Sequence, residues 1–138
     1  MPWQHAAVAF PDVELLLPTA IRPLLVAAGE AGVYVGRTIP NDAEGGRRPR
    51  MVLFTRDGGD DNGHTDRPRV RVRVFDQDDQ KATDLARTVA ALIPRLVGAT
   101  AVVYARKLSG PYDVPDASGQ HQRYLLFEIH TRPEEVLP

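Results

Sequence analysis

Residues Arg67–Val97 read RPRVRVRVFDQDDQKATDLARTVAALIPRLV, and the hydrophobic period changes within this stretch. Over Arg69–Phe75 valine alternates with arginine, which is the period of two expected of a strand with one buried face. After an acidic cluster, apolar residues recur at spacings of three and four, as on one face of a helix. We expect Asp76 to cap this helix and Asp78 and Asp79 to lie in its first turn, because free backbone amides favour carboxylates there. The stretch therefore predicts a strand followed directly by a helix.

The predicted helix carries a continuous apolar stripe of the width needed to lie on a sheet. Its members are Ala82, Leu85, Ala86, Val89, Leu92, Ile93 and Leu96. Pro94 should bend or end the helix, and Gly98 marks its exit. On the preceding strand, the alternation sends the valines to the core face and Arg69, Arg71 and Arg73 to the opposite face.

The residues before this unit predict one helix and two strands. The helix should begin with Asp12 as its N-cap, kink or break near Pro18, and end in the segment Gly29–Gly32. A glycine-rich acidic connection then joins two antiparallel neighbours, and we expect it to be an exposed, mobile tip. The strands and loops occupy residues 33–40 (strand), 41–49 (exposed loop), 50–56 (strand) and 56–68 (acidic loop).

Two more strands follow the main helix, so the order is helix, three strands, helix, two strands. The segments are residues 101–108 (strand), 109–120 (loop), 122–131 (strand) and 132–138 (polar tail). We expect an α+β domain with a mixed, largely antiparallel sheet of about five strands and two helices packed mainly on one face. Residues 1–138 should form a single domain with short N-terminal and C-terminal tails. The second sheet face should be wet or covered by another molecule.

The composition argues against several classes of protein. The formal net charge is −1 and 25% of the residues are charged, which indicates neither disorder nor a broad nucleic-acid surface. The absence of cysteine among the 138 residues excludes a disulfide framework and a thiolate site. No apolar run approaches the roughly 18 residues that span a bilayer, so we expect a soluble chain kept in a cytoplasm, without a membrane partner.

Residue types with catalytic or ligating chemistry do not form a known pattern here. The histidines are scattered, and no serine lies in a G-x-S-x-G turn. The acidic loop Asp57–Asp66 lacks the spacing and the late glutamate of a calcium loop, which favours a solvated loop over a metal site. Residues Gly45–Arg48 are compatible with phosphate contact, although loop solubility explains them as well. We therefore expect no enzymatic activity, no cofactor and no metal.

The arginine row Arg69, Arg71 and Arg73 is the most unusual feature of the sequence. On an edge strand such charges oppose pairing with other sheets, and on a central strand they repel one another unless solvent or partners intervene. The row is either a wet sheet face or a contact surface for acidic groups of a neighbouring subunit or for phosphates. Tyr112 and Tyr124, beside arginine and proline, are of the types enriched at interfaces, or the prolines merely stiffen a long loop.

Several segments together resemble a family of phage proteins. They are VYVGRTIP, the F-D-x-D-D-x-x-A-x-x-L-A pattern that begins at Phe75, the SGPYDVPD segment that begins at Ser109, and QHQRYLLFEIHTRP. In their order, over residues 10–133, they resemble the tail terminator (tail-to-head joining) proteins of long-tailed (siphovirus) actinobacterial phages. Other phage connector and minor tail proteins have similar size and sheet content.

The resemblance implies a structural virion protein without catalytic residues. Such a protein forms a homohexameric ring that caps the tail tube, ends tail polymerisation and joins the tail to a head-tail connector or stopper protein. Double-stranded DNA passes through the ring and touches it transiently without sequence readout. The implied location is the head-tail junction of the virion, after assembly in the host cytoplasm. Another connector or minor tail protein, or a small nucleic-acid-binding module that uses the arginine face, stays open as an alternative.

Closure of a ring is head-to-tail, so each subunit needs two different and complementary patches. Our hypothesis from the residues assigns the acidic loop and the arginine-bearing surface to opposite patches or to the tube-facing and lumen-facing sides. No residue is assigned to the lumen. The candidate interface residues are Arg69, Arg71, Arg73, Asp60, Asp61, Tyr112, Asp113 and Arg123.

Overall fold

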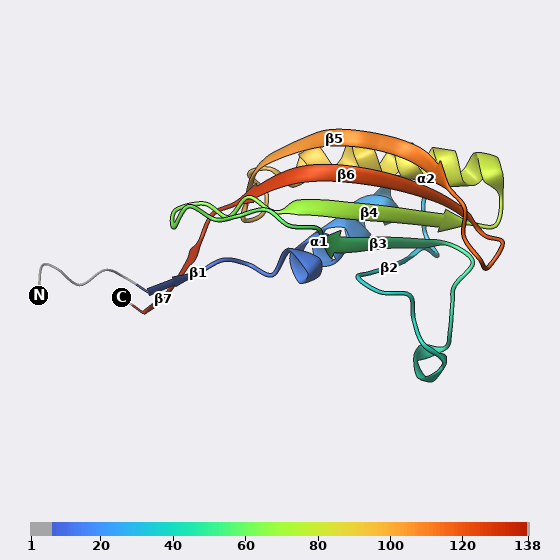
Figure 1. Cartoon of the computed structure of the whole chain (residues 1–138), viewed down its shortest axis with the longest axis horizontal. Coiled ribbons are helices and arrows are strands. Elements are labelled where there is room, and N and C mark those ends of the chain that lie inside the picture. The colour runs from blue at the N-terminus through green and yellow to red at the C-terminus, as the bar shows by residue number, and fades with distance from the viewer. Residues whose placement is uncertain (1–6, 138) are drawn as a thin grey trace, which may run out of the picture.

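Five strands form one mixed sheet, and two helices lie against one of its faces (Figure 1). The structure is a computed structural model that describes residues 7–137; residues 1–6 and 138 lie outside the described part. The elements are β1 (Ala7–Ala9), α1 (Val13–Ala27), β2 (Tyr34–Gly36), the 3-10 helix η1 (Asp42–Glu44), β3 (Met51–Arg56), β4 (Arg69–Asp76), α2 (Asp79–Leu92), the 3-10 helix η2 (Ile93–Leu96), β5 (Val102–Val114), β6 (His121–Thr131) and β7 (Glu134–Leu137).

The strand order across the sheet is β2-β3-β4-β6-β5. The short strand β2 runs parallel to β3, and the other neighbouring strands are antiparallel. The α+β class, the mixed sheet and the one-sided packing of the helices are confirmed.

The strand and helix of the arginine-rich unit form as the hydrophobic pattern predicts. The valines of β4 are buried against α2, whose Leu85 and Val89 are fully buried in the same core. Pro94 lies in η2, so α2 ends just before it, at Leu92. Burial of this apolar stripe, rather than helix propensity, stabilises α2.

The prediction that Asp76 caps α2 is wrong. Asp78 is the N-cap, and its side chain accepts a hydrogen bond from the Lys81 amide at 2.9 Å. Asp76 is the buried last residue of β4, where it pairs with His121 and accepts a 2.7 Å hydrogen bond from Arg50 Nε. Strand pairing therefore continues past the point where the sequence suggested a cap.

Helix α1 begins as predicted, with Asp12 as N-cap and a 3.0 Å hydrogen bond from the Glu14 amide. The predicted break near Pro18 is wrong, because the helix is continuous through Pro18 and Pro23. Its buried face holds it against the sheet on both sides of each proline. The helix ends as predicted at the glycine segment, where Gly29 has a φ of +84°.

Part of the second sheet face is covered by the chain itself. Met51, Leu53 and Phe75 point to this face and are fully buried, with Tyr34 and Ile39 packed against them. The expectation that only solvent or another molecule would cover this face is therefore wrong over β3. The uncovered part lies over β4, β6 and β5.

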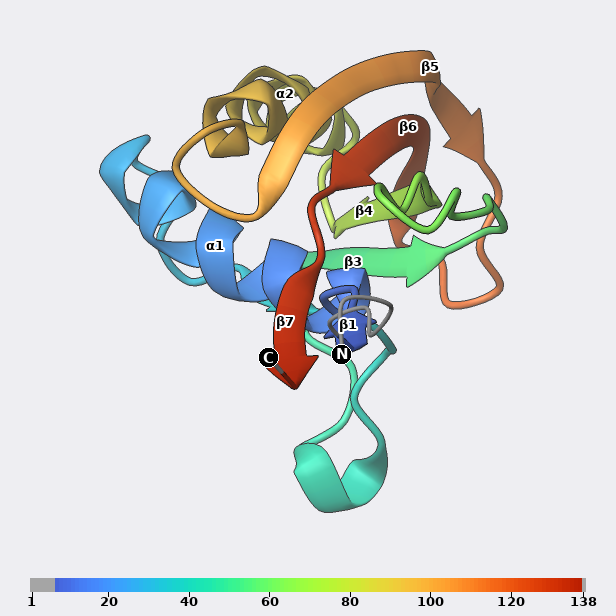
Figure 2. The same cartoon turned by 90° about the vertical axis from the view of Figure 1, so that its left-hand side faces the viewer.

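Strand β5 is longer than predicted, and β2 is shorter. Residues 109–114, expected in a loop, belong to β5 and pair with β6, although the register shifts several times along the ladder. Figure 2 shows β5 arching over α2. Pairing with a long neighbour outweighs the turn-forming glycine and proline of this segment.

Residues Ala7–Ala9 and Glu134–Leu137, which lie in the expected tails, form a second, two-stranded sheet. Strand β1 pairs antiparallel with β7, and Ala7 lies opposite Leu137. We call these two strands the terminal arm. Within residues 7–137, neither of its strands packs against any other helix or strand. The arm projects beyond the end of the main sheet (Figure 1).

Candidate interaction surface

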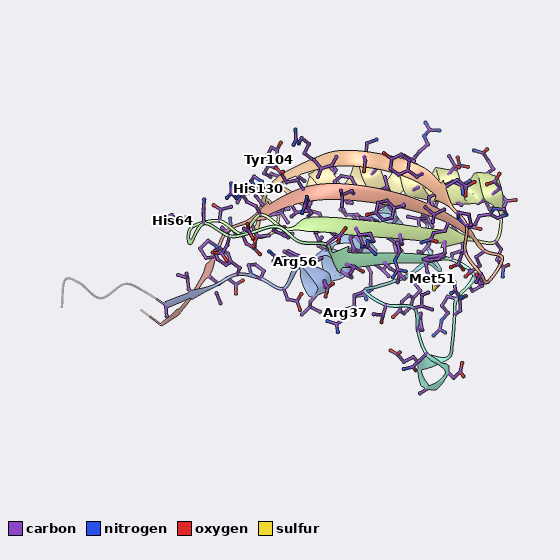
Figure 3. All side chains as sticks on the ribbon, viewed as in Figure 1. Arg37, Met51, Arg56, His64, Tyr104 and His130 are labelled. Carbon is purple, nitrogen blue, oxygen red and sulfur yellow. The ribbon has the colours of Figure 1, made fainter. Side chains whose placement is uncertain are left out.

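The uncovered part of the second sheet face gathers arginine and tyrosine side chains from three strands. We call this surface the arginine–tyrosine face; it consists of Arg69, Arg71 and Arg73 on β4, Tyr124, Glu128 and His130 on β6, and Tyr104, Arg106 and Tyr112 on β5. The register brings them together, because residues directly opposite one another in a ladder point to the same side. Figure 3 shows Tyr104 beside His130 near the arm end of the sheet.

Aromatic contacts organise this face. The guanidinium of Arg71 lies 5.8 Å from the centre of the Tyr124 ring, within the range of a cation–π contact. The rings of Tyr104 and His130 have centres 4.7 Å apart. Tyr104 and Tyr112 are 39% and 54% exposed, so both offer ring area to a partner. Exposed tyrosine next to arginine is typical of the centre of a protein interface.

Arg71 is partly paired within the subunit. Its Nη2 lies 3.3 Å from Asp57 Oδ1, while its Nε is buried and has no hydrogen-bond partner within residues 7–137. Burial lowers the pKa of Arg71, but the hydrogen bond and charge of Asp57 outweigh burial, so its pKa lies above the ordinary value. Arg71 is thus a fixed positive charge with an unused donor.

Arg73 has no ion-pair partner within the described residues, and its Nε is also buried without a hydrogen bond. Burial, and then the nearby charges of Arg71 and Arg47, lower the pKa of Arg73, with Asp116 opposing them. Its guanidinium lies 5.8 Å from the centre of the Phe75 ring, and that of Arg47 lies 5.5 Å from the same ring. Two arginines therefore cover Phe75 and leave this end of the face electropositive.

Two loops meet over that end of the face. Arg47 donates to Asp116 Oδ2 at 3.2 Å and to Gln120 Oε1 at 2.7 Å. Gln120 in turn donates to the Arg48 carbonyl at 2.9 Å. The loop before β3 and the loop between β5 and β6 are thus fastened to each other beside Arg73.

The acidic loop before β4 is anchored, which limits the mobility we expected of it. Asp66 is buried and accepts two hydrogen bonds from Arg56, at 2.6 and 2.8 Å. Its backbone also pairs with Thr131 at the end of β6. The exposed Asp60 lines a hollow of about 440 Å³ together with Arg69. The acidic loop and the arginine row therefore lie side by side in the subunit, and Asp57 lies 3.3 Å from Arg71.

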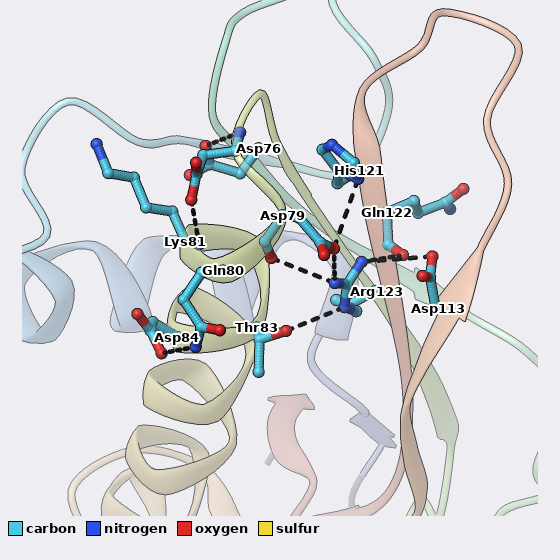
Figure 4. A network of polar contacts seen from close by, with 11 residues as sticks. Asp76, Asp79, Gln80, Lys81, Thr83, Asp84, Asp113, His121, Gln122 and Arg123 are labelled. Carbon is cyan, nitrogen blue, oxygen red and sulfur yellow. Dashed lines mark hydrogen bonds and ion pairs between the residues drawn. The ribbon is translucent and has the colours of Figure 1, made fainter.

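Arg123, one of the candidate interface residues, lies in the interior of the subunit (Figure 4). On the helix side of the sheet it donates to the side chain of Asp79 and, at 3.3 Å, to Thr83 Oγ1. It also lies 3.4 Å from Asp113 Oδ1. Arg123 therefore joins β6 and β5 to the first turn of α2 and is not available to a partner.

Acid should weaken the ion pair between Arg123 and Asp79. The hydrogen bond from Arg123 lowers the pKa of Asp79, so the stabilisation is complete above the ordinary carboxyl pKa and is lost as the pH falls through the lower native value. The melting temperature of the Asp79→Asn variant should therefore approach that of the wild type at low pH and fall below it at neutral pH. Thermal unfolding followed by circular dichroism between pH 2 and pH 7 measures this. A constant difference across the whole range would contradict the pairing.

Sequence reasoning identified part of this face and missed the rest. It found the arginine row, Tyr112 and Tyr124, but not Tyr104 and Arg106, which belong to the same face. Their spacing of two within a predicted strand was the available signal. The contacts of Arg47 with Phe75 and of Asp57 with Arg71 could not be predicted, because they depend on how loops fold over the sheet.

Other chemistry is sparse in the part of the chain that the structure describes. No three histidine or acidic side chains there converge as a metal site would require, and no helix there has the length and hydropathy of a membrane span. His64 lies exposed at the tip of the acidic loop (Figure 3). The sequence matches no protein-family model and no curated protein.

Proposed function

We propose that this chain is a structural subunit of a phage tail: a tail terminator that forms a hexameric ring on the tail tube, ends its polymerisation and joins it to the head connector. One observation supports this most, the arginine–tyrosine face of the sheet, where Tyr104 and Tyr112 are exposed and Arg73 has no ion-pair partner among the described residues. The resemblance of the chain's segments to that family supplies the biological setting. Another connector ring or minor tail protein is the nearest alternative.

The physical case for a protein partner lies in what the face leaves unsatisfied. Arg73 has no ion-pair partner among the described residues, and a hydrogen bond from a charged group such as its guanidinium to a partner's carboxylate contributes about 1.5–3 kcal/mol. Tyrosine also loses little conformational freedom for the contact area that it provides, and the planar guanidinium of arginine is pre-organised for hydrogen bonds to a carboxylate. A face of this kind favours an acidic, hydrogen-bonding partner such as a tube or connector subunit.

Oligomeric state tests the proposal most directly. Light scattering over a range of concentrations should give six times the subunit mass of 15.2 kDa, and negative-stain images should show rings with six-fold symmetry. The protein should also block further growth when it is added to polymerising tail tubes. Tubes that lengthen at an unchanged rate in saturating protein would refute the terminator role.

Charge reversal on the arginine row should abolish attachment to the tail while leaving the fold intact. In the Arg71→Glu/Arg73→Glu double variant, attachment to tail tubes should weaken at least about 100-fold, because hot-spot residues contribute 2 kcal/mol or more each. Sedimentation with tail tubes measures attachment, and circular dichroism checks the fold. The matched control is Arg87→Glu/Arg95→Glu, which makes the same charge change at exposed positions of α2 and η2. If the two variants attach equally well, the arginine row does not take part in the contact with the tail.

A nucleic-acid-binding module is the second candidate, because exposed Tyr104 and Tyr112 share the face with arginines. Aromatic side chains on an open sheet stack with unpaired bases, and arginines contact phosphates. Fluorescence anisotropy with single-stranded oligonucleotides at several salt concentrations would test it. Tight binding with a steep salt dependence that Tyr112→Ala weakens would favour the module over the ring.

A further inference from the structure

Strand β5 presents a long open edge. It is the last strand of the main sheet, and no strand pairs with its outer side within residues 7–137. Its exposed apolar residues are Val103, Tyr104, Leu108 and Tyr112. An edge of this length with exposed apolar side chains is a template for pairing with another strand.

One stretch of that edge has regular geometry and a defined charge. From Tyr104 to Lys107 the pairing with β6 is uninterrupted, and the register shifts on either side of this stretch. Arg106 and Lys107 within it are exposed. Two β5 edges placed side by side would bring these cations together, which disfavours self-pairing and favours an acidic strand.

The terminal arm carries a strand of that description. Strand β7 has 4 residues with the sequence EEVL, and β1 is its sole strand partner among the described residues. A two-stranded ribbon without a covering layer is marginally stable in water. The arm projects past the end of the sheet (Figure 1), and the second edge of β7 pairs with no other described strand.

We infer that β7 of one copy adds antiparallel to the outer edge of β5 of the next copy, along Tyr104–Lys107. The antiparallel register sets Glu134 opposite Lys107, so that opposite charges face each other across the contact. The contact uses a different element of each copy, so it can repeat head-to-tail, as closure into a ring requires. The inference rests on the proposed function in so far as copies of the chain associate. It extends that proposal by naming the strands that join them.

Disulfide trapping tests this register directly, because the chain contains no cysteine. Lys107→Cys and Glu134→Cys are made as separate variants of different tag length, mixed and oxidised. Directly opposed residues in a ladder have Cβ atoms about 4.5–5.5 Å apart, close to what a disulfide needs. The mixture should give at least about ten times more cross-linked heterodimer than Glu134→Cys mixed with Arg87→Cys, which places the thiol on exposed α2.

Charge exchange gives a second readout. Lys107→Glu and Glu134→Lys should each weaken association about tenfold, because each places like charges opposite one another. A chain that carries both substitutions should recover its association, because the acidic residue is then at position 107 and the basic residue at position 134, and opposite charges again face each other. Failure of the double variant to recover would contradict the proposed register.

The outcomes separate this inference from the proposed function. Six-fold rings without the Lys107–Glu134 cross-link would overturn the arm contact and leave the ring proposal standing. Cross-linked dimers or open filaments without rings would support the arm contact and overturn the hexamer. Disulfides between two Lys107→Cys copies in place of the mixed pair would show pairing of two β5 edges and overturn the inference. Persistent monomers without cross-links at any concentration would overturn it as well.

Discussion

The Gly110→Ala variant should lose about 3 kcal/mol or more of unfolding free energy, through backbone strain and overpacking together. Gly110 has a φ of +93°, a conformation that L side chains rarely adopt. A Cβ placed on it would lie 2.3 Å from the Tyr124 carbonyl oxygen and 3.0 Å from the Leu125 Cα, and both belong to the backbone of β6. Because neither atom can move without opening the ladder, β5 and β6 must separate locally.

Gly119→Ala is the matched control for that substitution. Gly119 has a φ of +83°, but a Cβ placed on it meets no atom within 4 Å. It should therefore lose only the conformational strain, about 1–2 kcal/mol. Urea denaturation of both variants measures the difference. Equal losses would show that the close approach of β5 to β6 contributes nothing to the effect of Gly110→Ala.

The Phe75→Ala variant should lose about 3–5 kcal/mol of unfolding free energy, as is usual when a buried aromatic ring is removed. Phe75 is fully buried, although two of its neighbours, Arg47 and Arg73, are charged. Without the ring, both guanidinium groups lose their cation–π contact. The loop that contains Arg47 then loses the side chain against which it packs. Faster hydrogen exchange over residues 37–50 should accompany the loss of stability.

Phe75→Leu separates the effect of the ring from that of burial. Leucine keeps most of the apolar volume, so the cost should be no more than about 1.5 kcal/mol. The cation–π contacts are nevertheless lost, and exchange over residues 37–50 should rise by an intermediate amount. Exchange unchanged in both variants would mean that the Phe75 ring does not support this loop.

Local periodicity was sufficient to predict the elements of the core. The alternation over Arg69–Phe75 repeats often enough to exclude a helix, and the stripe of α2 repeats at helical spacing often enough to exclude a strand. The capping residue of α2 was misassigned, because Asp76 is held by Arg50, a partner that is distant in sequence. The extension of β5 was missed since its glycine and proline resemble a loop, and pairing with β6 determines its structure instead.

The candidate surface could be predicted only in part, for a related reason. A single strand predicts which of its residues share a face, and this yielded the arginine row. Which residues of other strands join that face depends on register, which sequence periodicity does not determine. Arg123 was assigned to the wrong face for this reason. Side chains alternate between the two faces along β6, and Arg123 lies on the face that carries α2. The contact between Arg47 and Phe75 depends on a loop that has no period at all.

The pairing of Ala7 with Leu137 joins residues at opposite ends of the described chain, and this determines when the terminal arm can form during folding. Closing a loop between such distant residues is entropically costly and slow unless the intervening chain has already become compact. During synthesis Glu134–Leu137 also leave the ribosome after the other elements of the described residues. The arm should therefore form last. Under the arm contact that we infer, a nascent or partly folded copy could not yet join its neighbours.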